Sequence, residues 1–228
     1  MHIPDGFLDP KTWGTLYGVS GGTVAYALYR VKDRLTETKI PLLGITAAFI
    51  FAAQMLNFPV AGGTSGHYVG ALLACILLGP WEGLLTMTVV LMVQCFFFAD
   101  GGLTALGANV FNMGIIAGLL SYSLMILFKK PLAKWIGEKK ALLASTAIFS
   151  WLGVVLAASA CAIELAISGT VPLGVALPAM AGVHMLIGIG EAVITVVVLV
   201  VVLQTRPDLV YAYKGQALSP IKVAGEVA

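Results

Sequence analysis

The sequence predicts an all-α polytopic membrane protein with one domain of seven transmembrane helices. Of its 228 residues, 59% are hydrophobic and only 11% are charged, and the mean hydropathy is +0.97. A soluble domain carries about 25% charged residues. Apolar segments recur along the chain, and lysines and arginines gather in alternate connections between them. The net charge of +2 is too small to indicate a nucleic-acid partner.

Each expected helix is an apolar segment bounded by polar or glycine-rich residues. The seven segments are 13–32, 40–57, 66–79, 81–98, 104–128, 141–167 and 174–204. A helix needs about 20 residues to cross a bilayer, so the third segment is short. We expect the irregular stretch 57–67 to complete that crossing and to line a cavity, because non-helical backbone at membrane depth needs protein or water around it.

The positive charges predict the orientation of the helices. They fall after the first span, between the fifth and sixth, and after the seventh: Arg30, Lys32, Arg34, Lys39, Lys129, Lys130, Lys134, Lys139, Lys140, Arg206, Lys214 and Lys222. The connections 58–65, 99–103 and 168–173 carry neither Lys nor Arg. Because basic connections stay in the cytosol, we expect an outer N-terminal segment 1–12, a bundle 13–204 and a cytosolic tail 205–228.

The chain begins with the sequence MHIPDG. Asp5 and Asp9 precede the first basic residue, Lys11, which argues against a cleaved signal peptide, so we expect Met1 to remain the first residue. The Met1 amine, the His2 amide nitrogen and His2 Nδ1 would close adjacent five- and six-membered chelate rings on one metal ion. These nitrogens are nearly coplanar, and a fourth would complete a square-planar site of the kind that Ni(II) or Cu(II) prefers.

His67 is the candidate for the fourth nitrogen. It is one of three histidines, lies on the same predicted side of the membrane, and follows a glycine-rich loop in GTSGHYVGA. Pro4 and Gly6 suit a turn that folds the N-terminus toward the bundle. The alternative is that His2 stands at a frayed end by accident.

Several polar residues fall inside apolar segments. His184 and Glu191 lie seven residues apart on one helix face, and polar groups at that depth are expensive and usually functional. An interhelical hydrogen bond is the alternative for His184. We interpret Glu164 as an interfacial charge, and Gln54 and Gln94 as hydrogen bonders between helices. The three cysteines read as buried small side chains: Cys75, Cys95 and Cys161.

Glycines recur at four-residue spacing on the first span, at Gly14, Gly18 and Gly22. Such rows let two helices approach closely in lipid. They predict either packing within this chain, which we favour, or a docking face for another membrane subunit.

Three segments together resemble the CbiM/NikM family: MHIPDGFL, NFPVAGGTSGHYVGALLA and HMLIGIGEA. Its members are substrate-binding (S) components of energy-coupling-factor transporters for nickel and cobalt in prokaryotic cell membranes. The resemblance implies that Met1, His2 and His67 hold Ni(II) or Co(II) as transported substrate. It implies a second layer that orients these ligands: Asp5, Asn57, Ser65, His184 and Glu191.

The resemblance also implies partners. These are a transmembrane coupling subunit, two cytosolic ATPase subunits and a small accessory membrane subunit. The chain lacks the G-x-x-x-x-G-K-[ST] loop, so we expect it to bind no ATP and to be no enzyme.

One alternative comes from another functional class. GTSG at 63–66 matches the motif around the nucleophile of rhomboid-type intramembrane serine proteases. On that interpretation Ser65 is the nucleophile and His184 its base. The motif is short, and this alternative leaves MHIPDG unexplained.

Overall fold

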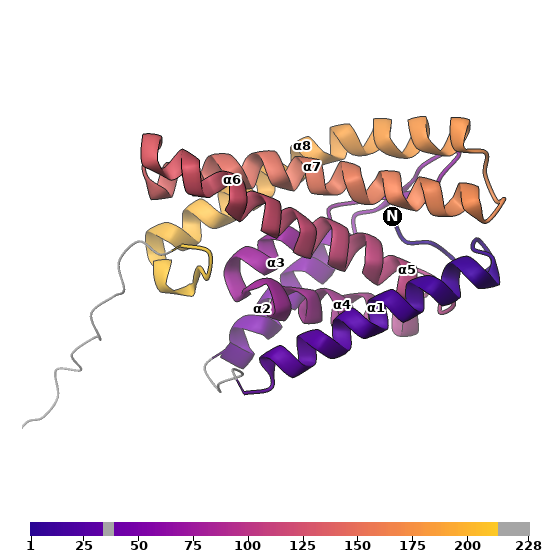
Figure 1. Ribbon diagram of the computed structural model, residues 1–228, viewed down its shortest axis with the longest axis horizontal. Coiled ribbons are helices and arrows are strands. Elements are labelled where there is room, and N and C mark those ends of the chain that lie inside the picture. The colour runs from indigo at the N-terminus through magenta and orange to yellow at the C-terminus, as the bar shows by residue number, and fades with distance from the viewer. Residues whose placement is uncertain (34–38, 214–228) are drawn as a thin grey trace, which may run out of the picture.

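Figure 1 shows the computed structural model, which describes residues 1–33 and 39–213. The described chain is helical except for connections and one short hairpin. The elements are α1 (Pro10–Val31), α2 (Lys39–Gln54), β1 (Phe58–Pro59), β2 (Ser65–Gly66), α3 (Ala71–Leu78), α4 (Pro80–Phe98), α5 (Leu106–Asn109), the π-helix η1 (Val110–Leu120), α6 (Ser121–Ile136), α7 (Glu138–Ile167), α8 (Leu173–Thr205) and the 3₁₀-helix η2 (Pro207–Leu209).

The predicted third span is wrong at its start, because residues 66–70 are not helical and α3 begins at Ala71. The backbone of this stretch bonds to side chains instead of to its own turn. Glu191 accepts hydrogen bonds from the N–H groups of Val69 and Gly70, and Gln54 donates to the Val69 carbonyl. Gly70, at φ +75°, then starts α3 in a conformation that favours glycine. The chain therefore stays extended just after His67.

The predicted connection between the fifth and sixth spans is also corrected. α5, η1 and α6 form one continuous helical run from Leu106 to Ile136, and α7 begins at Glu138. Only Gly137, at φ +84°, interrupts the two helices. The lysines of this region therefore lie on helix ends that extend beyond the apolar segments, because α6 continues past the residues that the hydropathy pattern marks.

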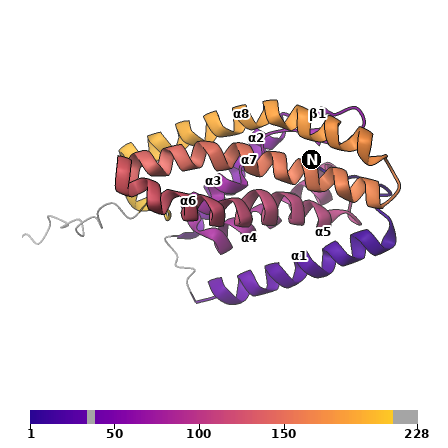
Figure 2. The same ribbon diagram turned by 45° about the horizontal axis from the view of Figure 1, so that its top comes forward.

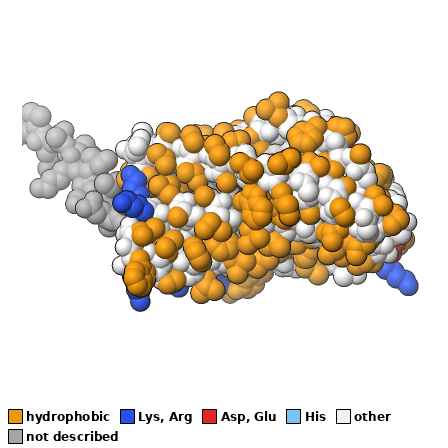
Figure 3. Space-filling view, turned by 90° about the horizontal axis from the view of Figure 1, so that it is seen from above, with side chains coloured by type: hydrophobic (Ala, Val, Ile, Leu, Met, Phe, Trp, Pro, Cys, Tyr) orange, Lys and Arg blue, Asp and Glu red, His pale blue; other side chains and the backbone are white. Residues whose placement is uncertain are grey.

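Four described helices are long and apolar enough to cross a membrane: Pro80–Phe98, Leu106–Ile136, Glu138–Ile167 and Leu173–Thr205. The face in Figure 3 is largely hydrophobic, with lysines and arginines near its two ends. In Figure 1 the described basic residues other than Lys11 belong to helix ends on the side away from the N-terminus. Arg34, Lys214 and Lys222 lie outside the described residues. These features define a helical membrane protein.

α7 and α8 run antiparallel along one side of the bundle, and α1 lies along the opposite edge (Figures 1 and 2). All eight residues of α3 are buried. After α8 the chain turns back, and Tyr211 and Ala212 donate backbone hydrogen bonds to carbonyls at the end of α3. The N-terminus lies inside the other end of the bundle, beside α7.

The glycine row on α1 does not pack within the described chain. A Cβ atom added at Gly14, Gly18 or Gly22 would meet no described atom within 4 Å. The favoured interpretation, internal packing, is therefore wrong for these residues. The row is an open strip along α1.

Candidate metal centre

The first three residues are threaded into the core. The exposed fractions of Met1, His2 and Ile3 are 0%, 4% and 0%. Ile3 N–H donates to Asn109 Oδ1 at 2.8 Å, and Gly102 N–H donates to the Ile3 carbonyl at 2.8 Å. This end of the chain is held by specific hydrogen bonds, so it is not frayed.

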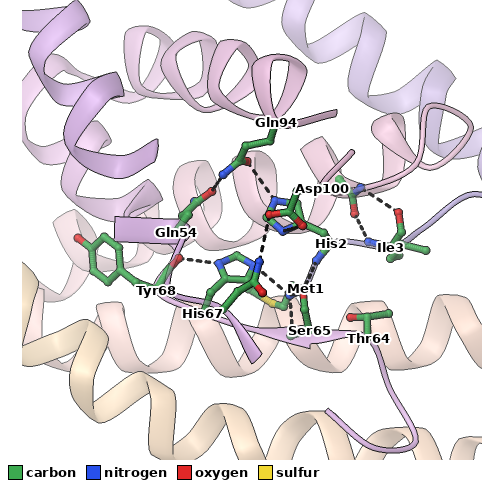
Figure 4. Close-up of polar contacts among 12 residues, drawn as sticks. Met1, His2, Ile3, Gln54, Thr64, Ser65, His67, Tyr68, Gln94 and Asp100 are labelled. Carbon is green, nitrogen blue, oxygen red and sulfur yellow. Dashed lines mark hydrogen bonds and ion pairs between the residues drawn. The ribbon is translucent and has the colours of Figure 1, made fainter. Parts of the chain in front are cut away.

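The Met1 amine lies at the centre of the site in Figure 4. It contacts the carbonyl oxygen of Ser65, donates to Ser65 Oγ at 2.8 Å, and lies 3.0 Å from His67 Nε2. The His2 amide N–H donates to the same Ser65 Oγ at 3.1 Å. The strand β2 and the residue that follows it therefore bring Ser65 and His67 against the terminal amine.

Hydrogen bonding fixes the tautomer of His67. Its Nδ1 lies 2.7 Å from the carbonyl oxygen of Tyr68, which can only accept, so Nδ1 carries the proton. Nε2 then has a free lone pair that faces the Met1 amine. The rings of His67 and His2 stack with centroids 4.6 Å apart and planes inclined by 18°.

A relay of two glutamines fixes the tautomer of His2. Gln54 donates to the Val69 carbonyl at 2.6 Å, and Gln94 donates to Gln54 Oε1 at 2.8 Å. Gln94 Oε1 therefore remains as an acceptor and lies 3.1 Å from His2 Nε2, which carries the ring proton. The lone pair of His2 is consequently on Nδ1.

His2 Nδ1 is buried and has no hydrogen-bond partner among the described residues. It lies 3.2 Å from Asp100 Oδ1, which is itself an acceptor when ionised. Two acceptors at this distance repel each other unless a proton or a metal cation lies with them. His2 Nδ1 thus has the properties of an unused ligand atom.

Burial keeps the site nitrogens uncharged at neutral pH. Desolvation lowers the pKa of the Met1 amine from 8.0 to about 5, an effect that Cys161 and Asp100 partly offset. Desolvation, together with the nearby amine, lowers the pKa of His2 to about 3 and that of His67 well below 6.5. Burial raises the pKa of Asp100. Uncharged nitrogens with free lone pairs are the forms that bind metal ions.

Two of the predicted second-layer residues lie outside the immediate site. Asp5 is exposed and accepts hydrogen bonds from the backbone and hydroxyl of Thr104, which lower its pKa. Asn57 donates to Asp100 Oδ2 at 3.1 Å, so it reaches His2 only through Asp100. Ser65, by contrast, contacts the Met1 amine directly.

Two polar residues of α8, His184 and Glu191, were also expected in the second layer. Glu191 holds the backbone just after His67 through Val69 and Gly70. His184 Nδ1 lies 2.7 Å from the Met180 carbonyl, and its buried Nε2 has no partner among the described residues. Glu191 therefore shapes the loop that carries His67.

Sequence reasoning missed three residues of the site: Gln94, Asp100 and Asn109. Gln94 was expected only to join helices; it does bond to Gln54 but also orients His2. Asp100 and Asn109 had a weak signal: Asp100 directly follows the fourth apolar segment and Asn109 lies near the start of the fifth, both on the predicted side of the N-terminus. No group of three or more His, Cys, Asp or Glu side chains suited to a metal ion occurs in residues 1–33 and 39–213. The candidate donors here include a terminal amine and a backbone amide, which such a pattern does not contain.

The arrangement gives no support to the protease alternative. Ser65 Oγ accepts hydrogen bonds from Met1 and His2, and in the described part of the chain no hydrogen bond joins it to His184. The hydroxyl is engaged by the N-terminal segment.

Fold and site together define a helical membrane protein with a buried cluster of nitrogen donors around its own N-terminus. The chain belongs to the CbiM family, whose model, described as the cobalt uptake substrate-specific transmembrane region, matches residues 2–209. It is therefore a metal-transport protein, with relatives that are named for transport and not for an enzymatic activity.

Relatives and a solved structure agree with this family. The chain is 44% identical to a putative fused nickel transport protein NikMN of Archaeoglobus fulgidus, over 98% of this chain and 71% of that protein. It is 32% identical to the cobalt transport protein CbiM of Sorangium cellulosum, over 96% and 99% of the two chains. A crystal structure of a truncated transition metal transporter is 35% identical and superposes with a TM-score of 0.81, covering 90% of this chain and 99% of that chain.

Proposed function

We propose that this chain captures Ni(II) or Co(II) at the outer side of a prokaryotic cell membrane for transport into the cell. The metal is held by four nitrogens in a square plane: the Met1 amine, the His2 amide, His2 Nδ1 and His67 Nε2. This site requires Met1 to be the first residue of the chain. Seven spans, an outer N-terminus and a cytosolic C-terminus belong to the same proposal.

The observation that carries the proposal is the contact between the Met1 amine and His67 Nε2. Two nitrogens on adjacent corners of a square, each ~2.0 Å from a metal, lie ~2.8 Å apart. The observed separation is 3.0 Å. The His2 tautomer adds to this support, because Gln94 leaves the lone pair on Nδ1, the atom that closes the six-membered chelate ring.

The geometry favours nickel over cobalt. Square-planar nitrogen coordination suits Ni(II), and Co(II) has a weaker preference for it. Cu(II) would bind still more tightly by intrinsic affinity, so metal availability must contribute to selectivity in the cell.

Transport requires partners that this chain does not supply. We propose that it is the substrate-specific component of an energy-coupling-factor transporter, with a transmembrane coupling subunit, two cytosolic ATPase subunits and a small accessory membrane subunit. The open glycine strip of α1, Gly14, Gly18 and Gly22, is the proposed docking face for the coupling subunit. The absence of packing on it within the described chain supports this assignment.

Acetylation of the Met1 amine tests the site. A chain acetylated at that nitrogen alone has an amide where the chelate needs an amine, and the acetyl group does not fit the buried position of Met1. We expect nickel affinity to fall at least ~100-fold. The matched control is the same chain prepared with a free Met1 amine. Equal affinity of the two chains would contradict the proposal.

His67→Ala is the companion test. It removes the proposed fourth nitrogen but leaves the chelate formed by Met1 and His2. We expect weaker nickel binding and loss of the absorption band that is typical of square-planar Ni(II). Unchanged binding would exclude His67 as a ligand, even if the N-terminal amine proves essential.

A further inference from the structure

Charged side chains are buried at both ends of the bundle. Near the end that holds the N-terminus, Glu164 is 6% exposed and accepts a hydrogen bond from Asn112 Nδ2 at 2.7 Å, so the prediction that it is an interfacial charge is wrong. At the opposite end, Lys129 is also 6% exposed. Its ammonium group donates to Glu138 Oε1 at 2.6 Å and to the Ala212 carbonyl at 2.8 Å. A buried charge needs such partners, and these tie the segment after α8 to α6 and α7.

The segment after α8, residues 206–213, forms a strap across the end of α3. Tyr211 N–H donates to the Leu77 carbonyl at 3.2 Å, and Ala212 N–H donates to the Ile76 carbonyl at 3.1 Å. The last carbonyls of a helix have no partner within it, so the strap caps the final turn of α3. In Figure 1 the strap is the yellow loop at the end of the bundle away from the N-terminus.

The other end of α3 carries the loop of a proposed metal ligand. α3 begins at Ala71, and His67 lies four residues before it. Glu191 of α8 accepts hydrogen bonds from the N–H groups of Val69 and Gly70 at 2.7 and 2.8 Å. α8 and the strap that follows it therefore hold α3 at both ends, which lie ~12 Å apart because each helical residue adds about 1.5 Å.

The flanks of α3 are suited to a small shift along its axis. All eight residues of α3 are buried, and two neighbouring helices meet it at glycines. A Cβ atom at Gly83 of α4 would lie 2.7 Å from the backbone nitrogen of Cys75, and one at Gly118 of η1 would lie 3.5 Å from Ala71 Cβ. Packed helices can slide past each other by small amounts, and glycines place no side chain in the way. α3 can therefore carry a displacement from one of its ends to the other.

We propose that α3 couples the strap to the metal centre. A docked strap holds α3 in the position in which His67 faces the Met1 amine. Release of the strap removes the donors from two buried carbonyls, which is costly, so α3 shifts and the loop before it withdraws His67. The inference rests on the proposed function and adds a means of releasing nickel from the site. Tyr211 is 51% exposed, so a partner at this end of the bundle can reach the strap.

Coupling between two sites is reciprocal, which allows a test in the unmodified chain. If strap release weakens nickel binding by some factor, bound nickel opposes strap release by the same factor. Such factors are typically ~5 to 150. Nickel should therefore slow hydrogen exchange at Tyr211 and Ala212, whose N–H groups lose their α3 partners only when the strap leaves.

The test is hydrogen exchange of the full chain in detergent, followed by mass spectrometry with and without saturating Ni²⁺. We expect exchange in the strap to be at least about fivefold slower with nickel. The control is the last turn of α1, at the same end of the bundle, where Lys32 N–H donates to the Leu28 carbonyl. This turn belongs to neither α3 nor α8, so its exchange should not change.

Lys129→Met tests the same coupling by a change at the end of the bundle away from the proposed ligands. It removes the donor to the Ala212 carbonyl, so strap exchange should quicken and nickel affinity should fall about fivefold or more. Lys130→Met is the matched control, because the neighbouring lysine of α6 is exposed. We expect that control to keep normal strap exchange and normal affinity.

Three results would overturn the inference. One is strap exchange that Ni²⁺ leaves unchanged. Another is an equal slowing in the α1 control, which would mean that nickel stabilises the whole fold. The third is a Lys129→Met chain whose strap exchanges freely and which still binds nickel with normal affinity. The first two decide the question even if Lys129→Met does not fold. An unmodified chain that binds no Ni²⁺ would instead contradict the proposed function.

Discussion

The amino nitrogen of Met1 lies 3.0 Å from Nε2 of His67, although the two residues are 66 positions apart in the chain. Both atoms are buried, and both lack a positive charge at neutral pH because burial lowers their pKa values. A terminal amine normally stays in water because its charge is costly to bury. Here the neutral amine is placed against a histidine lone pair, an arrangement that suits the proposed metal binding.

The hydrogen bond from His2 to Gln94 predicts that nickel affinity can be lowered without the removal of any proposed ligand. Gln94→Leu removes the acceptor that holds the proton on His2 Nε2, so His2 loses its fixed tautomer. We expect nickel affinity to fall roughly 10- to 100-fold, as for other partners of metal-binding histidines. Titration calorimetry measures the change. Thr88→Val on the same helix is the control, because among the described residues the Thr88 hydroxyl donates only to the Leu84 carbonyl. An equal loss of affinity in both variants would refute the relay.

The number of protons released when Ni(II) binds reports whether the Met1 amine is charged before binding. Because its pKa is lowered from 8.0 to about 5, the docked amine is already neutral between pH 6 and 8. Ni(II) should then release close to one proton, from the His2 amide, in that range. Calorimetry in buffers of different protonation enthalpy counts the protons. A release of close to two protons per Ni(II) between pH 6 and 7 would indicate that the amine is exposed and charged before binding.

The same pKa shift sets how docking responds to acid. The detached amine takes up a proton as pH falls through 8.0, whereas the docked amine does so only near 5. Docking is therefore most stable above pH 8 and weakens as pH falls toward 5. Nickel affinity should decline through this window, more steeply below pH 5. An affinity independent of pH from 5 to 8 would contradict the amine–amide chelate.

Gly102 controls whether the N-terminal segment fits. A Cβ atom at this position would lie 2.2 Å from the backbone nitrogen of Asp5, which neither backbone can avoid without moving. Gly102→Ala should displace the segment and lower nickel affinity about tenfold or more. Gly21→Ala, where a Cβ meets nothing within 4 Å, is the control. If Gly102→Ala binds nickel normally, the tight fit around Asp5 is not needed for the site.

Changes in the glycine strip of α1 should affect assembly with the coupling subunit and leave nickel binding unchanged. Gly18→Leu places a large side chain in the middle of the strip, and we expect the coupling subunit to be lost on co-purification while nickel affinity is unchanged. Gly182→Leu is the control, since Gly182 on α8 is equally free of contacts. Normal co-purification of the Gly18→Leu chain would show that the coupling subunit docks elsewhere.

Hydropathy predicted where the helices lie better than where they begin and end. Each of the seven apolar segments contains a helix, because long apolar runs have few other stable states in lipid. The start of α3 could not be predicted, since it depends on Glu191 and Gln54 binding the backbone of Val69 and Gly70. Glu191 and Gln54 come from distant parts of the sequence, so the local helix propensity of residues 66–70 does not predict these hydrogen bonds.

The residues of the proposed site were easier to single out than their surroundings. Met1 and His2 can form a chelate through covalent geometry alone, so their sequence positions are informative, and His67 was one of only two other histidines. That they bind metal stays a prediction. The tautomers depend on Tyr68 and Gln94, whose roles follow from the fold. Asp5 and Asn57 were expected close to the ligands but lie further out, because Thr104 and Asp100 occupy their polar groups.

X-ray absorption spectroscopy at the nickel edge of the Ni(II)-loaded chain tests the central claim most directly. We predict a square-planar nickel with four nitrogen donors and no sulfur, and the loss of that signature when the Met1 amine is acetylated. A six-coordinate spectrum dominated by oxygen, or a nickel–sulfur distance from Met or Cys, would contradict it.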